Sequence, residues 1–361
     1  MKAAVFHQPG SPLTIEDVAI ARPGPREVLI RTAAVGMCHS DLHFVDGLYP
    51  YPTPVILGHE AAGIVEAVGA DVRTVKPGDH VVTCLTAFCG HCAHCVTGRL
   101  NLCESPETRR RQDEEPRLAY GHKPMTQFLN LSAYAEQMLV HENALAAIRR
   151  DMPLDRAALL GCAVITGTGA VFNTARVRPG ETVAVIGCGG IGLSAINGAA
   201  LAGAGRIIAV DMLDSKLELA RRFGATDTVN PRHGDPVQQV IDLTRGGVHD
   251  AFECIGLKQT AEQAFGMLRR GGTATVIGMI KPGTKLEIDP YALLHERRLQ
   301  GSYMGSNHFP VDLPNLVDYY MQGRLKLDEL ISQRIRLDQI NEGFAELRRG
   351  ELARSVIVFE H

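Results

Sequence analysis

Hydrophobic and polar positions follow two different patterns along this chain, and the change between them falls near residue 165. Before it, short β-like segments such as Glu27–Arg31 and Gly63–Val68 are separated by turns rich in Pro and Gly. After it, as far as about residue 303, apolar runs alternate with helical patterns. The apolar runs that we expect as strands are Thr182–Ile186, Arg206–Val210, Asp250–Cys254 and Ala274–Ile277.

Strands that alternate with helices form βαβ units, and such units build a parallel sheet with helices on its faces. We therefore predict a doubly wound α/β domain over residues 165–303. The β-rich segment 1–164 is expected to form a second domain. The chain ends with the β-like run Ser355–Phe359, and we expect the segment 304–361 to return to that second domain.

Composition narrows the class of protein without giving its function. The 361 residues are 45% hydrophobic and 21% charged, which is typical of a globular chain long enough for two cores. A net charge of -3 with interspersed signs favours a small neutral ligand over nucleic acid or a membrane. The N-terminus has no secretory pattern and no apolar run approaches the roughly 20 residues that span a bilayer, so we predict a cytoplasmic protein.

Residues 104–128 form a polar and highly charged stretch, ESPETRRRQDEEPRLAYGHKPMTQF. The stretch is long for a structureless connection. Runs of charge are usually solvated, so a surface loop is the simpler interpretation, and a lid or rim over a pocket is the alternative.

Four of the nine cysteines crowd into one short segment with the spacing C-x2-C-x2-C-x7-C. They are Cys89, Cys92, Cys95 and Cys103. This spacing lets one loop wrap four thiolates around a tetrahedral ion, and four protein ligands leave no open position, so we predict a structural zinc site. An iron–sulfur cluster or ordinary buried cysteines are the alternatives. The interleaved His91 and His94 are expected to be exposed bystanders.

A glycine-rich turn follows the predicted strand Thr182–Ile186 and precedes a small-residue helix over Leu193–Leu201. The turn matches G-x-G-x-x-G, the dinucleotide-binding pattern of a Rossmann domain, and the helix N-terminus would offer amide donors to a pyrophosphate. A purely structural turn is the alternative. The turn consists of Gly187, Cys188, Gly189, Gly190, Ile191 and Gly192.

Asp211 stands at the end of the next expected strand, about twenty residues after the glycine-rich turn. A carboxylate at this place accepts hydrogen bonds from the ribose hydroxyls and repels a 2′-phosphate, which favours NAD over NADP. The alternative is a solvated acid that begins a turn.

Three further metal-binding side chains lie in separate segments: Cys38 in Gly36–Asp41, His59 beside Glu60, and Cys162 near the expected domain junction. Two Cys and one His are a ligand set of an open zinc site. Spacing alone does not bring them together, and each taken singly is more often a buried Cys or a surface His.

As a set, these motifs resemble the zinc-containing alcohol dehydrogenases of the medium-chain dehydrogenase/reductase superfamily over nearly the whole chain. The resemblance implies a Rossmann domain plus a β-rich GroES-like catalytic domain built from both chain ends, with NAD and two zinc ions per chain. The segments that carry it are Gly36–Asp41, Gly58–Glu60, Cys89–Cys103, Gly161–Gly167, Gly187–Gly192 and Phe252–Gly256.

The resemblance also implies roles for single residues. Cys38, His59 and Cys162 would hold the catalytic zinc, with Glu60 beside it as an occasional ligand, and Asp41 would orient His59. The residues implied in proton transfer are Ser40, which would receive the alcohol proton, and His43, which would pass it to solvent. Those implied in cofactor binding, besides the glycine-rich turn and Asp211, are His39, Thr166, Lys216 and Arg354.

The implied reaction is reversible hydride transfer to NAD from a primary alcohol, with allylic and aromatic alcohols among the candidates, giving the aldehyde. A dehydrogenase for the adduct of formaldehyde with a thiol is the alternative within the same family. An NAD-binding regulatory protein without turnover is the alternative of a different class. Members of the family form dimers or tetramers, so a homo-oligomer is expected.

Overall fold

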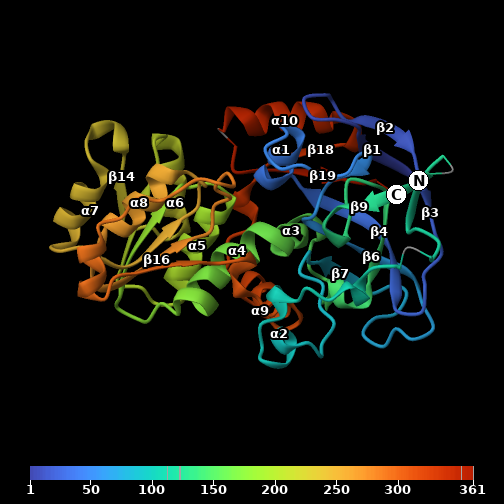
Figure 1. Ribbon diagram of the computed structural model, residues 1–361, viewed down its shortest axis with the longest axis horizontal. Coiled ribbons are helices and arrows are strands. Elements are labelled where there is room, and N and C mark those ends of the chain that lie inside the picture. The colour runs from blue at the N-terminus through green and yellow to red at the C-terminus, as the bar shows by residue number, and fades with distance from the viewer. Residues whose placement is uncertain (112, 122, 351, 361) are drawn as a thin grey trace. The chain divides into compact units, whose positions relative to one another are not determined.

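The structure is a computed structural model that describes residues 1–111, 113–121, 123–350 and 352–360. The chain divides into two compact units (Figure 1). One unit contains Met1–Cys162 together with His308–His361, and the other contains Ala163–Asn307.

The unit Ala163–Asn307 is built on a parallel six-stranded sheet, which agrees with the predicted doubly wound α/β class (Figure 1, green to orange). In spatial order its strands are β14 (Asp227–Val229), β13 (Arg206–Val210), β12 (Thr182–Ile186), β15 (Val248–Glu253), β16 (Leu268–Val276) and β17 (Arg298–Gly301). The helices of this unit are α4 (Ile165–Gly169), α5 (Gly190–Leu201), α6 (Asp214–Phe223), α7 (Pro236–Thr244) and α8 (Lys258–Gly266).

The central strands of this sheet are apolar on both faces because helices cover both sides of a parallel sheet. In β12 and β13 the last four residues of each strand are buried. Phe265 and Met267, at the end of α8, pack into the same core with residues of β15. The carboxyl ends of these strands carry the loops that hold the glycine-rich turn and Asp211.

The other unit contains two largely antiparallel sheets (Figure 1). The strands of the first, in spatial order, are β2 (Thr14–Asp17), β1 (Lys2–Phe6), β5 (Val55–Ile56), β9 (Lys123–Gln127), β8 (Leu118–Tyr120) and β3 (Ala19–Ile20). The strands of the second are β11 (Leu145–Ile148), β7 (His80–Thr83), β6 (Ala61–Val68), β4 (Glu27–Gly36), β19 (Arg354–Val358) and β18 (Ile331–Ile335), with β10 (Gln137–His141) paired to β4. The helices are α1 (His39–Val45), α2 (Ala93–Val96), α3 (Leu154–Leu159), α9 (Phe309–Met321) and α10 (Ile340–Arg349).

The C-terminal segment belongs to the same compact unit as the N-terminal residues. Strand β19 pairs antiparallel with β4, so Val356 lies opposite Gly36. The backbone N–H of Met37 donates to the carbonyl of Ser355 at 2.9 Å. The last strand therefore lies directly beside the segment that leads into Cys38 and α1.

One helical stretch is long and apolar enough to cross a membrane by length and composition alone. Leu154–Ala175 is 22 residues long and reaches a mean hydropathy of 1.5, although its apolar character is interrupted in the sequence by polar residues. Of its most apolar 18 residues, 83% are buried inside the protein, as in the core helix of a globular protein.

The charged stretch 104–128 is largely solvent-exposed, as its composition predicted, but it is not a structureless loop. It includes a helical turn at Pro106–Thr108 and the two strands β8 and β9. Arg117 is only 6% exposed, and its Nε donates to Oε1 of the buried Glu27 at 2.7 Å. Arg110 donates to the same carboxylate. Two of the residues in the predicted loop, Gln112 and His122, lie outside the described ranges.

Candidate metal centres and dinucleotide site

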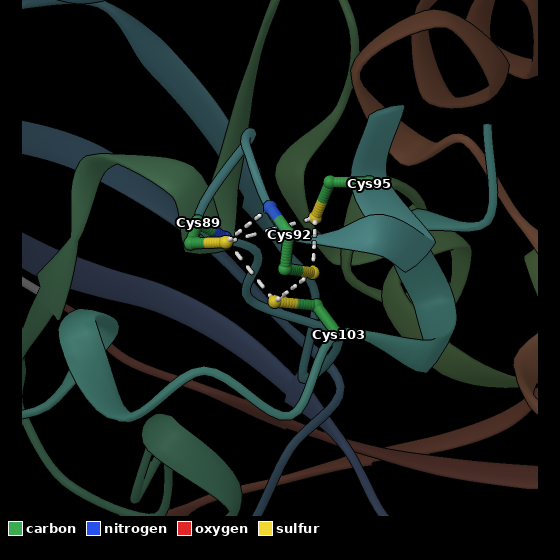
Figure 2. A group of neighbouring side chains, drawn as sticks. All are labelled: Cys89, Cys92, Cys95 and Cys103. Atoms are coloured by element: carbon green, nitrogen blue, oxygen red, sulfur yellow. Dashed lines mark hydrogen bonds between the residues drawn. The ribbon is translucent and has the colours of Figure 1, made fainter. Parts of the chain in front are cut away.

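The four clustered cysteines converge on one point (Figure 2). The sulfur atoms of Cys89 and Cys95 are 3.9 Å apart, and those of Cys92 lie 3.5 Å from Cys95 and 3.9 Å from Cys103. Four sulfurs at about 2.3 Å from a tetrahedral zinc ion are separated by about 3.8 Å. The donor set and its spacing therefore fit a zinc ion with no open coordination position.

Backbone amides favour thiolate formation in this loop. The backbone N–H of His91 lowers the pKa of Cys89 to about 6, and the amide of Cys92 also donates to the Cys89 sulfur at 3.4 Å. Burial raises the pKa of Cys95 to about 12, so this thiol needs a metal ion to ionise near neutral pH. The His91 side chain points away to Glu107 at 3.0 Å and is 64% exposed, as expected of a bystander.

Cys38, His59 and Cys162 form a second group, although they are far apart in sequence. Their donor atoms all lie within 4.8 Å of one another, and all three residues are buried. The two sulfurs are 4.0 Å apart, and His59 Nε2 lies 3.2 Å from Cys162 Sγ. Two thiols and one imidazole fit a zinc site that leaves a position for a further ligand.

The local fold explains how each of these side chains is placed. Cys38 is the residue that precedes α1, and His59 follows β5 just before β6 begins. Cys162 lies in the helical stretch that continues from α3. The Cys162 thiol donates to the Cys38 sulfur, which lowers the pKa of Cys38 well below its usual value, and this favours the thiolate that a metal ion needs.

Asp41 orients the imidazole of His59, as the resemblance predicted. His59 Nδ1 lies 2.9 Å from Asp41 Oδ1, so the imidazole donates from Nδ1 and turns Nε2 toward Cys162. Burial alone would lower the pKa of His59, but the charge of Asp41 outweighs it and holds this pKa well above the usual value. Metal binding at Nε2 must therefore release a proton.

Glu60 and Arg354 are the charged pair beside this group. Both side chains are buried, and Arg354 Nε lies 3.6 Å from Glu60 Oε1. The same guanidinium approaches Cys38 Sγ at 3.9 Å and the carbonyl of Met37 at 3.4 Å. Arg354 therefore lies beside the candidate metal ligand Cys38, with its side chain only 3% exposed.

Helix α1 carries three predicted residues, His39, Ser40 and His43, within its first five positions. His39 is exposed, Ser40 and His43 are half-buried, and Ser40 Oγ lies 3.6 Å from Cys38 Sγ. The ring of His43 lies 6.0 Å from that of Tyr49. The serine is therefore next to the candidate metal ligands, and the histidine lies one turn farther along the helix.

The glycine-rich turn connects β12 to α5 as the pattern requires. A side chain at Gly192 would place its Cβ 1.7 Å from the carbonyl oxygen of Gly187, so this close approach of helix and strand requires glycine. A Cβ at Gly189 would meet nothing within 4 Å, so the backbone there is open to a ligand. Gly190 and Ile191 begin α5, whose first amides would face a phosphate.

Asp211 directly follows β13 and lies against the same turn. Its Oδ2 accepts a hydrogen bond from the amide of Cys188 at 2.8 Å, and its Oδ1 accepts one from Leu213 at 3.0 Å. Lys216 is half-buried on α6. Thr166 is 5% exposed on α4, and its hydroxyl faces Met304 Sδ at 3.5 Å.

Two groups near the metal ligands were missed in the sequence. Tyr134 is fully buried, and its hydroxyl donates to Asp41 Oδ2 at 2.8 Å. Phe128 packs at 6.2 Å from the ring of His59, and the rings of Phe44 and Tyr51 lie 4.9 and 5.0 Å from Phe128. No motif marks these residues, because each is an aromatic side chain in an ordinary apolar context.

Comparison with known proteins agrees with this geometry. Residues 24–150 match the alcohol dehydrogenase GroES-like domain family, and residues 190–319 match the zinc-binding dehydrogenase family. Alcohol dehydrogenase 1 of Trifolium repens is 39% identical, with 99% of this chain and 97% of that protein covered. An S-(hydroxymethyl)glutathione dehydrogenase of Escherichia coli is 40% identical, with 99% of each chain covered. The solved benzyl alcohol dehydrogenase of Acinetobacter calcoaceticus superposes with a TM-score of 0.94 at 33% identity, with 99% of each chain covered.

Fold, donor sets and relatives together define the class of protein. The chain belongs to the zinc-containing alcohol dehydrogenases of the medium-chain dehydrogenase/reductase superfamily. It is an oxidoreductase whose relatives act on small molecules, and its Cys and His groups fit two zinc ions. The interpretation as a binding protein without turnover is disfavoured because both ligand sets are complete.

Proposed function

We propose that this protein is an NAD-dependent dehydrogenase that reversibly oxidises a primary alcohol to the aldehyde at Cys38, His59 and Cys162. The observation that carries this proposal is the buried group of two thiols and one imidazole, with donor atoms within 4.8 Å and the imidazole held by Asp41. Such a set is typical of catalytic rather than structural zinc, because it leaves a coordination position for substrate.

A zinc ion held there would stabilise negative charge on the alcohol oxygen, and NAD would accept the hydride. The chain supplies proton transfer and orientation. Ser40, whose Oγ lies 3.6 Å from Cys38 Sγ, would receive the alcohol proton. His43, half-buried one turn along α1, would pass the proton to solvent. Glu60 is proposed as an occasional ligand, and its neighbour Arg354 balances its charge.

NAD rather than NADP is supported by Asp211 at the end of β13. Its carboxylate would accept hydrogen bonds from the ribose and repel a 2′-phosphate. We propose that the glycine-rich turn holds the pyrophosphate, and that His39, Thr166, Lys216 and Arg354 give further contacts to the cofactor. Replacing Asp211 by Asn removes the charge, and kcat/KM for NADP relative to NAD should rise; an unchanged ratio would argue against this assignment.

The substrate class is proposed from the aromatic side chains next to His59. Phe128, Phe44, Tyr49 and Tyr51 form a connected set of ring contacts with centroid separations of 4.9 to 5.8 Å. Apolar rings beside a metal site favour apolar alcohols, including aromatic ones. The thiol adduct of formaldehyde is the second candidate, because the 40% identical Escherichia coli relative is named as a dehydrogenase of such an adduct.

The test is NADH formation at 340 nm with aliphatic, allylic and aromatic alcohols and with formaldehyde plus several thiols, on protein of known zinc content. We expect turnover of one alcohol class with NAD and two zinc ions per chain. Turnover of the thiol adduct alone would select the second candidate. Absence of zinc and of turnover would leave a cofactor-binding protein.

We also propose that the protein is a homodimer or homotetramer in a reducing cytoplasm. Strand β17 is an edge strand of its sheet, and three exposed apolar residues precede it, namely Tyr291, Leu293 and Leu294. Exposed strand edges and apolar side chains are typical of surfaces that associate. None of the nine cysteines forms a disulfide, which supports a reducing compartment. Light scattering on the purified protein would measure its mass.

A further inference from the structure

Tyr134 donates a hydrogen bond to Asp41, the residue that orients His59. Its hydroxyl donates to Asp41 Oδ2 at 2.8 Å, while Asp41 Oδ1 accepts from His59 Nδ1 at 2.9 Å and from the backbone N–H of Gly58 at 3.2 Å. Tyr134 and Asp41 are fully buried and His59 is 1% exposed. The carboxylate is therefore held by three donors at a site without access to bulk water.

The distribution of donors over the two carboxylate oxygens has a consequence for His59. A buried carboxylate oxygen without a donor is costly, so a carboxylate that loses one partner turns toward other donors. The Tyr134 hydroxyl satisfies Oδ2 and leaves Oδ1 aligned with His59 Nδ1. This alignment fixes the imidazole with Nε2 toward Cys162.

The backbone around Tyr134 holds its hydroxyl in place. Its N–H donates to the carbonyl of Leu57 at 3.0 Å, and its carbonyl accepts from Ala4 at 2.9 Å. The ring packs against the backbone of Gly58, where an added Cβ would meet the ring at 2.9 Å. Phe344 contacts the ring edge-on at 6.1 Å. Tyr134 therefore contacts Leu57 and Gly58, the two residues that immediately precede His59.

We propose that Tyr134 is a positioning residue for the zinc ligand His59 and acts through Asp41. Loss of its hydroxyl should let Asp41 turn away from His59, so that the ion bound by Cys38, His59 and Cys162 is held less tightly. The proposal rests on the proposed catalytic zinc site, and it concerns the retention of the ion as well as turnover.

The test is Tyr134→Phe, which removes the hydroxyl and keeps the ring. Loss of a partner that orients a metal ligand typically costs 10–100-fold in metal affinity, and we expect roughly tenfold faster release of one zinc to a chelator. The second zinc, held by Cys89–Cys103, should leave at the wild-type rate. In the cobalt-substituted protein, the absorption bands of the Cys38 site should change.

Two further variants separate positioning from general destabilisation. Tyr320→Phe is the matched control, because the Tyr320 hydroxyl also donates to a carboxylate, Asp328 at 3.2 Å, but near the surface; its zinc release should equal that of wild type. Asp41→Asn should accelerate release by itself, and adding Tyr134→Phe to it should have little further effect. Independent, multiplicative effects of the two substitutions would contradict action through Asp41.

The wild-type protein must first be shown to hold two zinc ions, because a chain with only one would refute the proposed catalytic site rather than the role of Tyr134. Unchanged zinc release and cobalt spectrum in folded Tyr134→Phe would overturn the proposal. If this variant does not fold, wild-type protein labelled with 13Cζ-tyrosine replaces it. Removing the catalytic zinc should then shift the Tyr134 resonance and leave that of Tyr320 in place, and an unshifted Tyr134 resonance would overturn the proposal.

Discussion

Asp250 is a buried carboxyl group whose ionisation lowers the free energy of unfolding. It lies in β15 and is 7% exposed, and burial, together with the charge of Glu181, raises its pKa from 3.8 to about 7. The folded chain therefore holds this proton more tightly than the unfolded chain. The stability that the protonated group contributes is fully present below about pH 4 and is lost as the pH rises through 7.

Asp250→Asn should remove this pH dependence because an amide does not ionise. Between pH 5 and pH 8 the urea midpoint of the wild type should fall more than that of the variant. The difference corresponds to at most about 3 kcal/mol, because only the two pH units between 5 and the folded pKa contribute. The exposed Asp71→Asn provides a control that should follow the wild-type curve. Parallel pH curves for wild type and Asp250→Asn would contradict the assignment.

His39 offers a second prediction at the level of one side chain. It is exposed at the first position of α1, and we propose that it contacts the cofactor pyrophosphate. Arginine carries a permanent charge and a bidentate donor pair, so His39→Arg should lower the Kd of NAD by roughly tenfold, or about 1.4 kcal/mol. Fluorescence titration with NADH and NAD checks this. The exposed His7→Arg serves as control, and an unchanged Kd in His39→Arg would refute the contact.

Residues were predictable where chemistry fixes their spacing or type. The zinc site of the Cys89–Cys103 loop could be predicted from sequence alone, because four cysteines at such short spacing are typical of metal binding. Cys38, His59 and Cys162 were assigned through family resemblance and were then found together. Tyr134 was not predictable, because only the three-dimensional approach of its hydroxyl to Asp41, 93 positions away in sequence, distinguishes it from any core aromatic residue.

Among the elements, the loop Cys89–Cys103 allows a direct test of its metal. Its helical turns are very short, α2 having four residues, so their own hydrogen bonds do little to hold the loop together. Cys103→Ser should reduce the zinc content from two ions to one and make this loop sensitive to proteases, while the Cys38 site keeps its ion. Cys84→Ser, the same change at a buried cysteine outside both groups, should keep two.

Strands were predicted best where they are buried in the parallel sheet. Thr182–Ile186 and Arg206–Val210 were predicted with the bounds that the structure has, because a run of apolar residues ends abruptly at each side. Strand β8 was missed inside the charged stretch. Its neighbour Arg117 is stabilised by Glu27, which is 90 positions away, and composition alone gives no sign of this pairing.

The whole chain brings distant segments together at the candidate catalytic site. Arg354 and Cys38 are 316 positions apart and within 3.9 Å, and Cys162 is 124 positions from Cys38. The return of β19 to β4 was predictable as a β-like run, but its pairing partner was not, because any exposed strand edge could have accepted it. The grouping of these distant residues was predicted from the family resemblance, because the local sequence pattern gives no sign of it.

Selective removal of the zinc ion proposed at Cys38, His59 and Cys162 is the measurement that tests the central claim most directly. A mild chelator should remove one zinc per chain first, and NADH formation from the best alcohol should fall in proportion and return on adding zinc. Cys162→Ser, which retains the Cys89–Cys103 loop, should contain one zinc and remain inactive after zinc is added. Full activity with zinc only in that loop would contradict the assignment of catalysis to Cys38, His59 and Cys162.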